Sequence, residues 1–447
     1  MNTFLELQAA SNKYRKQVWR YFYGRKKNLS KYLEQYQNHE LNALWLLSIE
    51  KPAELSLFLD TPFYCLERLI NNPTYKFYQV EKKKGGKREI YAPNDELKKV
   101  QKKLNYYLQA SYLCIKPEEA HGFVINPGYL GAKCNIVENA RVHTHKKYVL
   151  NIDLKDFFSN ISGKQVWSIF SSHPFNYNEQ ISTALTLLTT YEGKLPTGAP
   201  TSPVISNVVC LKLDAELKEF CSEHLLNYSR YADDLTFSTE SPISDDILLD
   251  IINLIKNNGF FINEKKLRVR SSNRKQIVTG IIVNEKVNVD RTLLRKIRAM
   301  LHDFSRNGLH HATQKHFKLI GFVDKKYQVQ FINRLQGYIN FVGQVRGKSD
   351  SRYLSLMQSF DDCFGVKKYT DIKEVEFKIE FFNTAYRKED YLKLAINSYL
   401  SGDYNVAATF LDDFIYTNGN LTIDSNDIVH SLKYLLEYRE LKSNQGH

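Results

Sequence analysis

The sequence predicts an α+β fold, because helical and β-type patterns occupy different parts of the chain. Residues 1–70 carry apolar side chains at helical spacing, for example at Leu41, Leu44 and Trp45. Short runs rich in Val, Ile, Thr, Tyr and Phe dominate the middle of the chain, and helical spacing returns from Arg291 onward. We therefore expect a sheet in the centre of the sequence, with helical regions before and after it.

The composition is that of a large, basic chain. Lys and Arg number 62 against 49 Asp and Glu, which gives a formal charge of +13, and aromatic residues make up 13% of the 447 residues. This suits a protein that binds phosphate backbones and stacks on bases, although an ordinary basic protein shows the same charge. The six cysteines contain no CxxC pair, which argues against a zinc site or a disulfide framework. No apolar run has membrane-spanning length and no leader peptide is evident, so we expect a cytoplasmic protein without membrane contact.

Cationic and aromatic residues alternate near the N-terminus, in residues 13–16 and 19–27. Two interpretations stay open for this segment. It forms helices that dock through their apolar side with the cations in solvent, or it contacts an RNA backbone and stacks on bases. After it, residues 75–81 and 88–92 predict two strands joined by a basic, glycine-containing loop, and residues 96–110 predict a helix.

The residues with the clearest chemistry are aspartates at the ends of two β-prone runs. Residues 147–153 form a mostly apolar run that ends at Asp153, and residues 227–238 form two short runs around Asp233 and Asp234. The adjacent pair by itself also fits an ordinary acidic turn. A carboxylate that closes a buried strand needs compensation, and a metal ion is the usual one. Together, Asp153 and Asp233 predict a site for two Mg²⁺ ions about 4 Å apart, an arrangement used for phosphoryl transfer between nucleotides.

Three motifs in the same order resemble those of reverse transcriptases. Tyr-Ala-Asp-Asp at residues 231–234 resembles the YxDD box, Asp153 with Phe158 resembles the first palm motif, and residues 195–203 are similar to the LPQGxPxSP motif of the bacterial enzymes. The resemblance implies a right-hand polymerase fold with fingers, a palm built on an antiparallel sheet, and a helical thumb, plus helical N- and C-terminal extensions. It also implies that Asp153, Asp233 and Asp234 are the catalytic metal ligands, with two Mg²⁺ ions as cofactors.

The resemblance further implies a set of nucleotide-binding residues: Lys87, Arg88, Phe158, Gly198 and Lys266. The two fingers cations would meet the triphosphate, and the aromatic ring would collide with a ribose 2′-hydroxyl. The glycine would let the backbone approach the nucleotide, and Lys266, with Lys265 as the alternative, would protonate pyrophosphate. A solvated basic turn, a core aromatic and two solvated lysines stay open as ordinary alternatives. Thr197 departs from the usual Gln of the motif, which leaves its effect on nucleotide binding open.

Two shorter motifs resemble those of retron reverse transcriptases, namely NAxxH at residues 139–143 and Val-Thr-Gly at residues 278–280. On this resemblance we expect RNA contacts from Asn139, His143, Arg295 and Arg298. The resemblance also implies the partners. A structured non-coding RNA from the same locus would serve as template and primer, and dNTPs would be the substrates. The product would be an RNA–DNA duplex, branched at a guanosine 2′-hydroxyl as in msDNA, and an effector protein would act with the enzyme in anti-phage defence.

The expected domains are a helical N-terminal region (residues 1–70), fingers and palm (71–290), a thumb (291–360) and a helical C-terminal extension (361–447). The extension contains two predicted helices, 391–399 and 404–411, that faintly resemble a tetratricopeptide pair. Two alternatives for the function stay open. One is a non-retron defence-associated or group II intron-like reverse transcriptase with another RNA partner and priming mode. The other is a non-catalytic RNA-binding protein on a degenerate polymerase fold.

Overall fold

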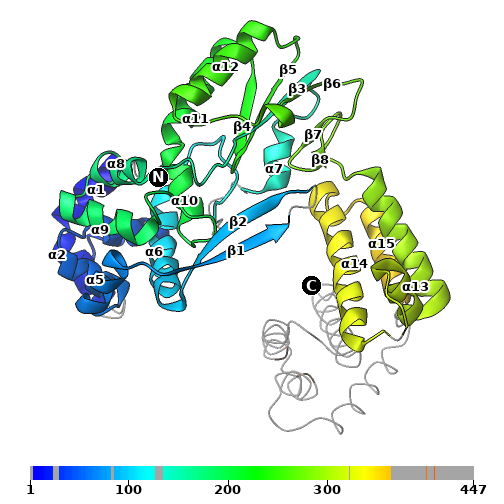
Figure 1. Cartoon of the computed structure of the whole chain (residues 1–447). Coiled ribbons are helices and arrows are strands. Elements are labelled where there is room, and N and C mark those ends of the chain that lie inside the picture. The colour runs from blue at the N-terminus through cyan, green and yellow to red at the C-terminus, as the bar shows by residue number, and fades with distance from the viewer. Residues whose placement is uncertain are drawn as a thin grey trace, which may run out of the picture. The chain divides into compact units, whose positions relative to one another are not determined.

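The computed structural model describes residues 4–23, 30–81, 85–125, 134–321 and 323–363, together with Tyr399 and Ala407. The chain divides into two compact units, Met1–Asn288 and Val289–His447 (Figure 1). Apart from those two single positions, the predicted helices 391–399 and 404–411 lie outside the described residues. None of the described helices combines the length and the hydropathy that a membrane span requires.

The first unit begins with helices, as predicted. They are α1 (Phe4–Lys13), α2 (Arg15–Tyr23), α3 (Asn38–Leu47), α4 (Pro52–Leu59) and α5 (Phe63–Asn71). Helix α3 is the centre of this region, because every residue from His39 to Leu47 is buried. The Trp45 ring stacks on Phe22 at a centroid distance of 4.1 Å and meets the Phe58 ring edge-on at 4.8 Å. Aromatic packing on Trp45 therefore joins both α2 and α4 to the same central helix.

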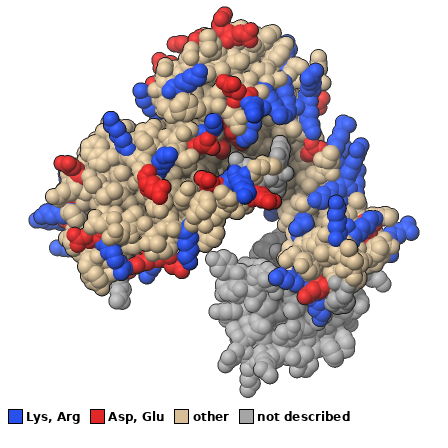
Figure 2. All heavy atoms as spheres, in the orientation of Figure 1, with Lys and Arg blue, Asp and Glu red and all other residues tan. Residues whose placement is uncertain are grey.

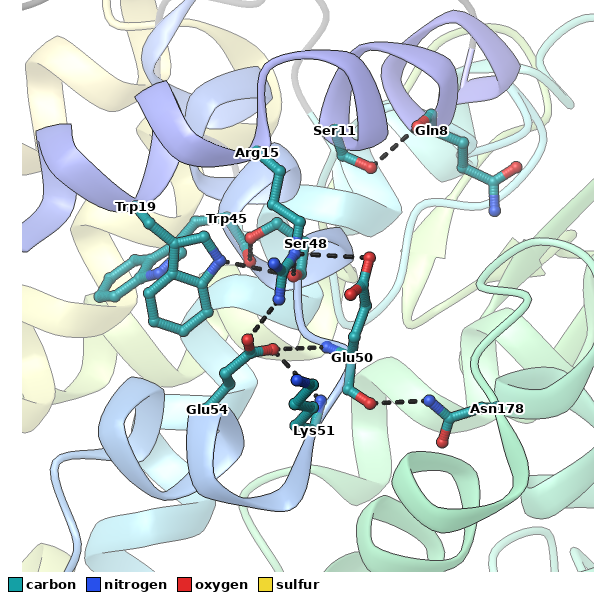
Figure 3. A network of polar contacts seen from close by, with 10 residues as sticks. All are labelled: Gln8, Ser11, Arg15, Trp19, Trp45, Ser48, Glu50, Lys51, Glu54 and Asn178. Carbon is teal, nitrogen blue, oxygen red and sulfur yellow. Dashed lines mark hydrogen bonds and ion pairs between the residues drawn. The ribbon is translucent and has the colours of Figure 1, made fainter.

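Helix α2 is fixed to this core by polar contacts (Figure 3). The Arg15 guanidinium donates to the carbonyl of Ser48 at 2.9 Å and pairs with the carboxylates of Glu54 and Glu50. The Trp19 indole N–H donates to the same Ser48 carbonyl at 3.4 Å. These contacts favour the docked interpretation for Arg15 and Trp19, because both side chains are occupied within the protein.

Two strands and a long helix follow, as predicted. Strands β1 (Tyr75–Glu81) and β2 (Lys87–Pro93) pair in antiparallel fashion, and α6 (Asp95–Leu113) comes directly after them. The side chain of Asn94 caps α6 by accepting a hydrogen bond from the Leu97 amide at 2.9 Å. Nearly all of β1 is exposed, so the hairpin of β1 and β2 presents most of its β1 side chains to solvent. It is called the fingers hairpin below, after its place in the expected fold.

The predicted antiparallel sheet contains β3 (Tyr148–Asp153), β4 (Asn227–Tyr231), β5 (Asp234–Thr239) and β6 (Arg268–Ser271), in the order β4-β5-β3-β6. On β3, Leu150 and Ile152 lie opposite Phe237 and Leu235 of β5, and all four side chains are buried. Side chains alternate between the two faces of a strand. This apolar face therefore lies against the core, and Asp153 points to the other face.

Further helices complete the described part of the first unit. They are α7 (Ile136–Arg141), α8 (Gly163–Ser171), α9 (Glu179–Thr189), α10 (Ser202–Val209), α11 (Leu211–Glu223) and α12 (Asp245–Asn257), with a 3₁₀ turn η1 (Glu264–Lys266). Residues 276–283, which include the Val-Thr-Gly motif, are rich in β-branched side chains. They form two short paired strands, β7 (Ile277–Val278) and β8 (Ile281–Ile282). The chain reverses between them because Thr279 and Gly280 have φ values of 46° and 86°.

The second unit contains α13 (Arg291–Phe317), α14 (Lys325–Arg346) and α15 (Ser351–Cys363). Helix α13 bends at Gly308, whose φ of 75° is not helical. A short turn joins α14 to α15, and it is held by a two-pronged ion pair between Arg346 and Asp350 with N–O distances of 2.8 Å. Helix α15 packs against both α13 and α14, which favours the interpretation that it belongs with these helices.

Candidate active site

The three aspartates meet where β3 ends and the β4–β5 hairpin turns. Asp153 lies directly opposite Asp234 in the antiparallel pairing, so both side chains point to the same face of the sheet. The Leu154 amide donates to the carbonyl of Asp233 at 2.9 Å. Because Tyr231 pairs with Asp234, the turn between β4 and β5 has only two residues. Its first residue, Ala232, has a φ of 59°, which is unfavourable for a residue with a side chain.

Negative charge is concentrated at this point of the sheet. Burial raises the pKa of Asp233, and repulsion from Asp153 raises it further. The pKa of Asp234 is raised to about 6, first by desolvation and then by repulsion from Asp233 and Asp153. Asp234 has an exposed surface, but the protein atoms around its carboxylate still desolvate it. The site therefore holds more negative charge than its own cations compensate.

Lys266 supplies one compensating charge. Its Nζ donates to Asp153 Oδ1 at 2.6 Å, and the turn η1 carries it there. The Asn263 amide donates to the Asp153 carbonyl at 2.8 Å, which fixes this turn to the end of β3. Of the two candidate lysines, Lys266 is therefore the one that the structure pairs with an aspartate of the site.

The donor set fits a hard divalent cation. Carboxylate oxygens are the ligands that magnesium prefers, and their raised pKa values indicate uncompensated charge. Asp153, Asp233 and Asp234 are the residues that would hold such ions. Within the described ranges, no group of three His, Cys, Asp or Glu side chains is arranged so that it could hold a metal ion. The present contact of Lys266 with Asp153 must open before Asp153 Oδ1 can bind a metal.

The fingers hairpin places one of its two predicted cations toward the aspartates. The positive charge of Arg88 lowers the pKa of Asp233, in opposition to burial, so the guanidinium acts on the site. Lys87 and Arg88 are both exposed and, as neighbours on β2, point to opposite faces of the strand. The geometry therefore favours Arg88 over Lys87 as the cation that meets a substrate near Asp233.

Gly198 lies against the same hairpin. Its φ is 119°, and a Cβ at this position would stand 2.8 Å from Ile90 Cγ2 and 3.0 Å from the Tyr91 carbonyl oxygen. The Tyr91 amide donates to the Thr197 carbonyl at 2.8 Å. A side chain at position 198 is therefore excluded by the fingers strand, and the exposed residue remains accessible from solvent.

Phe158 is half-buried and lies among aromatic rings. Its ring centroid is 5.8 Å from that of Phe123 and 5.4 Å from that of Phe157. Phe123 has a φ of 59°, and its carbonyl accepts a hydrogen bond from the Gln109 side chain at 2.9 Å. The packing restricts the Phe158 ring while leaving part of it exposed, as a surface that senses a sugar would require.

The side chains of Asn139 and His143 are completely buried, which counts against the predicted RNA contact through them. The two ring nitrogens of His143 each lie 2.7 Å from a serine hydroxyl, Ser238 on β5 and Ser229 on β4. Desolvation lowers the pKa of His143 to about 3, so the ring is neutral. A side chain without exposed surface does not contact RNA. His143 instead links the segment after α7 to both strands of the β4–β5 hairpin. The two serines lie on the same face of the sheet as Asp234.

The two retron-like motifs lie next to each other. Thr279 of the Val-Thr-Gly turn donates from its hydroxyl to the carbonyl of Ile136 at 3.1 Å, at the beginning of α7. On the other side, the Asn227 side chain of β4 donates to the Val142 carbonyl at 3.0 Å. Helix α7, which carries Asn139, therefore connects the β7–β8 turn to the catalytic hairpin. Apart from the presence of both motifs, no pattern in the sequence predicted this arrangement.

Arg295 and Arg298 lie in the second unit, on the exposed surface of α13. Figure 2 shows Lys and Arg side chains gathered over this unit. Lys296 between them donates to the Tyr338 hydroxyl of α14 at 3.1 Å. The exposure of both arginines is compatible with contact to a phosphate backbone, which stays a prediction.

Comparisons with known proteins agree with these motifs. A family model described as "Reverse transcriptase (RNA-dependent DNA polymerase)" matches residues 80–329. The chain is 31% identical to the retron Ec86 reverse transcriptase of Escherichia coli over 299 residues, which cover 65% of this chain and 82% of that enzyme. It is 32% identical to the retron Mx65 reverse transcriptase of Myxococcus xanthus over 252 residues, or 52% of this chain and 56% of the relative.

Among solved structures, telomerase from Candida albicans in complex with a fragment of telomeric RNA is similar with a TM-score of 0.36 and 10% identity. The match covers 66% of this chain and 64% of the telomerase chain. The family match extends over more than half of the chain, through the fingers hairpin, the catalytic sheet and the start of the second unit. This chain is therefore a reverse transcriptase of the bacterial retron type, an RNA-directed DNA polymerase.

Proposed function

We propose that this enzyme copies a structured non-coding RNA into DNA by two-metal nucleotidyl transfer, as the polymerase of a retron that acts in anti-phage defence. The observation that carries the chemical part is the meeting of Asp153 and Asp234 across the sheet, next to Asp233 in the turn. Raised pKa values at Asp233 and Asp234 support it, because they indicate a site that needs added cations.

The proposed reaction joins a primer hydroxyl oxygen to the α-phosphorus of a dNTP and breaks the bond to pyrophosphate. Reverse transcriptases use divalent metal ions. Two Mg²⁺ ions, held by Asp153, Asp233 and Asp234, would supply acidification of the primer hydroxyl and neutralisation of the leaving group. Lys266 starts in contact with Asp153 and, once released, is close enough to donate a proton to the departing pyrophosphate.

The fingers residues would select and hold the nucleotide. Arg88, and more weakly Lys87, would bind the triphosphate from the exposed hairpin. Phe158, packed by Phe123, would exclude a ribose 2′-hydroxyl and so favour dNTPs. Gly198 would keep the backbone of its motif open toward the nucleotide. The Thr197 contact to β2 uses its carbonyl, so the replacement of the usual Gln leaves this link intact.

The remaining assignments follow the domain prediction. Residues 71–290 would form fingers and palm, and α13 to α15 would form the thumb, whose Arg295 and Arg298 hold the duplex by its backbone. The template would be a non-coding RNA of the same locus, recognised mainly by shape and backbone. Priming from an internal guanosine 2′-hydroxyl and an effector partner rest on the resemblance to retron enzymes.

Purification of the protein from its native operon tests this proposal. We expect a single co-purifying RNA species with DNA attached to a guanosine 2′-hydroxyl, detected by sequencing after treatment with a debranching enzyme. The purified complex should also incorporate labelled dNTPs on a primed RNA template, and chelation by EDTA should stop incorporation. A linear, unbranched DNA would contradict retron priming but would not contradict the polymerase activity. Absence of any incorporation would contradict the catalytic proposal itself.

A further inference from the structure

We infer that Arg230, a fully buried residue without an assigned role, is a positioning residue of this polymerase. Its guanidinium holds the carbonyl of Ala232 and thereby sets the place of Asp233 in the turn. The inference rests on the proposed role of Asp233 as a metal ligand.

Arg230 forms a closed ion pair below the catalytic hairpin. It lies on β4 opposite Leu235, so its side chain points to the core face of the sheet, away from the face of Asp153 and Asp234. Nε and Nη2 donate to the two carboxylate oxygens of Asp214 on α11, at 2.8 and 2.6 Å. The Tyr228 hydroxyl donates to the same carboxylate at 2.8 Å. Both charged side chains are 0% exposed, so neither is available to solvent or to substrate.

The remaining nitrogen of the guanidinium connects this ion pair to the turn. Nη1 donates to Asn207 Oδ1 at 2.9 Å and to the Ala232 carbonyl at 3.2 Å. Ala232 has a φ of 59°, a conformation that a residue with a side chain adopts only when its surroundings hold it. The Arg230 guanidinium contributes to this restraint, because its ion pair with Asp214 fixes the orientation in which it donates to the turn.

A neighbouring segment leaves the turn no room to shift. The Arg230 amide donates to the Glu119 carbonyl at 2.8 Å, and the His121 amide donates to the Arg230 carbonyl at 2.9 Å. This pairing brings Gly122 against the turn, where a Cβ would stand 2.3 Å from the Ala232 nitrogen. The Asn207 side chain donates to the Gly122 carbonyl at 2.9 Å. The turn is thus held by the guanidinium and by the backbone of Gly122.

Stability and positioning can be separated in this arrangement. A buried ion pair can often be replaced by apolar residues of similar volume without loss of stability. An apolar side chain, however, does not donate to the Ala232 carbonyl. If Arg230 has a purely structural role, an apolar replacement of the ion pair should retain polymerase activity. If Arg230 positions the turn, the same replacement should lower that activity.

The test is the full-length triple variant Arg230→Met, Asp214→Leu and Tyr228→Phe, which removes the charges and the hydroxyl together. It leaves Asn207 Oδ1 and the Ala232 carbonyl without their donor, so the melting temperature should fall, but the protein should still fold and bind its co-purifying RNA with unchanged Kd. We expect kcat for dNTP incorporation to fall about 100-fold while KM for dNTP stays within about threefold, because a small misplacement of a catalytic group mainly slows the chemical step. A folded triple variant with kcat within about threefold of the wild type would overturn the inference.

The variant Gly122→Ala should displace the same turn without any change of charge. It tests whether the position of the turn controls kcat even if the triple variant fails to fold. We expect the same loss of kcat with KM and RNA binding retained. Wild-type kcat in folded Gly122→Ala would overturn the inference as well. Gly163→Ala is its matched control, because a Cβ there would find its nearest neighbour at an ordinary 3.5 Å. Arg15→Met with Glu54→Gln removes the ion pair of Figure 3 and should lower the melting temperature without changing kcat.

Asp233→Asn separates this inference from the proposed function. Loss of incorporation in Asp233→Asn together with normal kcat in the triple variant would reject the positioning role and keep the catalytic proposal. Normal incorporation in Asp233→Asn would reject the catalytic proposal on which the inference rests.

Discussion

Two β-hairpins of this enzyme differ in how they are held. The catalytic hairpin, β4–β5, is fixed on both faces, by the Arg230–Asp214 pair on the core face and by His143 on the face of the aspartates. The fingers hairpin, β1–β2, is exposed along most of its length and carries Lys87 and Arg88 in solvent. Both are antiparallel pairs of similar length, so strand pairing alone does not explain the difference.

The comparison teaches that the two hairpins meet different requirements. Metal ligands must be placed to a fraction of an ångström, and buried, fully paired polar groups give that precision. On the proposed function, the β1–β2 hairpin would admit a charged substrate from water, and its cations would stay hydrated until the substrate arrives. Changes in the catalytic hairpin should therefore alter the chemical step or the fold, and changes in the fingers hairpin should alter substrate affinity.

The largest effect is expected from Asp233→Asn in the catalytic hairpin. Loss of one carboxylate from the metal site should reduce incorporation by roughly 10³-fold or more, since it removes charge that acts in the transition state. RNA binding and melting temperature should stay near the wild type. The measurement is single-turnover primer extension beside RNA binding by filter retention. Asp156→Asn, at an exposed position outside the site, is the control and should retain activity. Lost RNA binding in Asp233→Asn would indicate a role in folding instead.

The next effect is a loss of stability from His143→Leu. The substitution leaves the buried hydroxyls of Ser229 and Ser238 without their partner, which should lower the free energy of unfolding by about 2–4 kcal/mol. Urea unfolding measures it, with the exposed His145→Leu as the control. RNA affinity of the folded His143→Leu protein should be unchanged. A selective loss of RNA affinity at normal stability would support the original prediction of direct RNA contact.

A pH effect follows from the same buried imidazole. The pKa of His143 is lowered from 6.5 to about 3, so between these values a proton binds only the unfolded chain and the free energy of unfolding falls as pH falls. Each such histidine contributes a slope of up to about 1.4 kcal/mol per pH unit. His121, with a pKa lowered to about 4, adds a second contribution. Urea unfolding between about pH 7 and about pH 5 should therefore show a smaller slope in His143→Gln than in the wild type. Equal slopes would mean that His143 is protonated in the folded state.

The smallest effect is expected in the fingers hairpin. Arg88→Gln should raise KM for dNTP about fivefold, equivalent to about 1 kcal/mol, because an exposed cation contributes little binding energy. Melting temperature and kcat should change little. Lys87→Gln, on the opposite face of the strand, is the matched control and should have a smaller effect in steady-state kinetics. A larger effect from Lys87 than from Arg88 would reverse the assignment of the two cations.

Much of the local structure could be predicted from the sequence. The runs 75–81 and 88–92 became strands, Asp153 closed its strand, and Asp233 lies in the turn between two strands, because alternation and turn chemistry are local properties. Residue type did not report that Asn139 and His143 are buried, so burial counts against their predicted RNA contact, which stays a prediction.

The sequence by itself determined the family, the order of the motifs and the three aspartates at strand ends, since these depend on residue identity and spacing. Only the tertiary structure decided that His143 binds serines 86 and 95 residues away. Only the tertiary structure showed that Arg230 contacts Asp214, Asn207 and the carbonyl of Ala232 in the turn. The physical reason is that a buried polar side chain must find its partners wherever packing brings them, and no local pattern encodes that meeting.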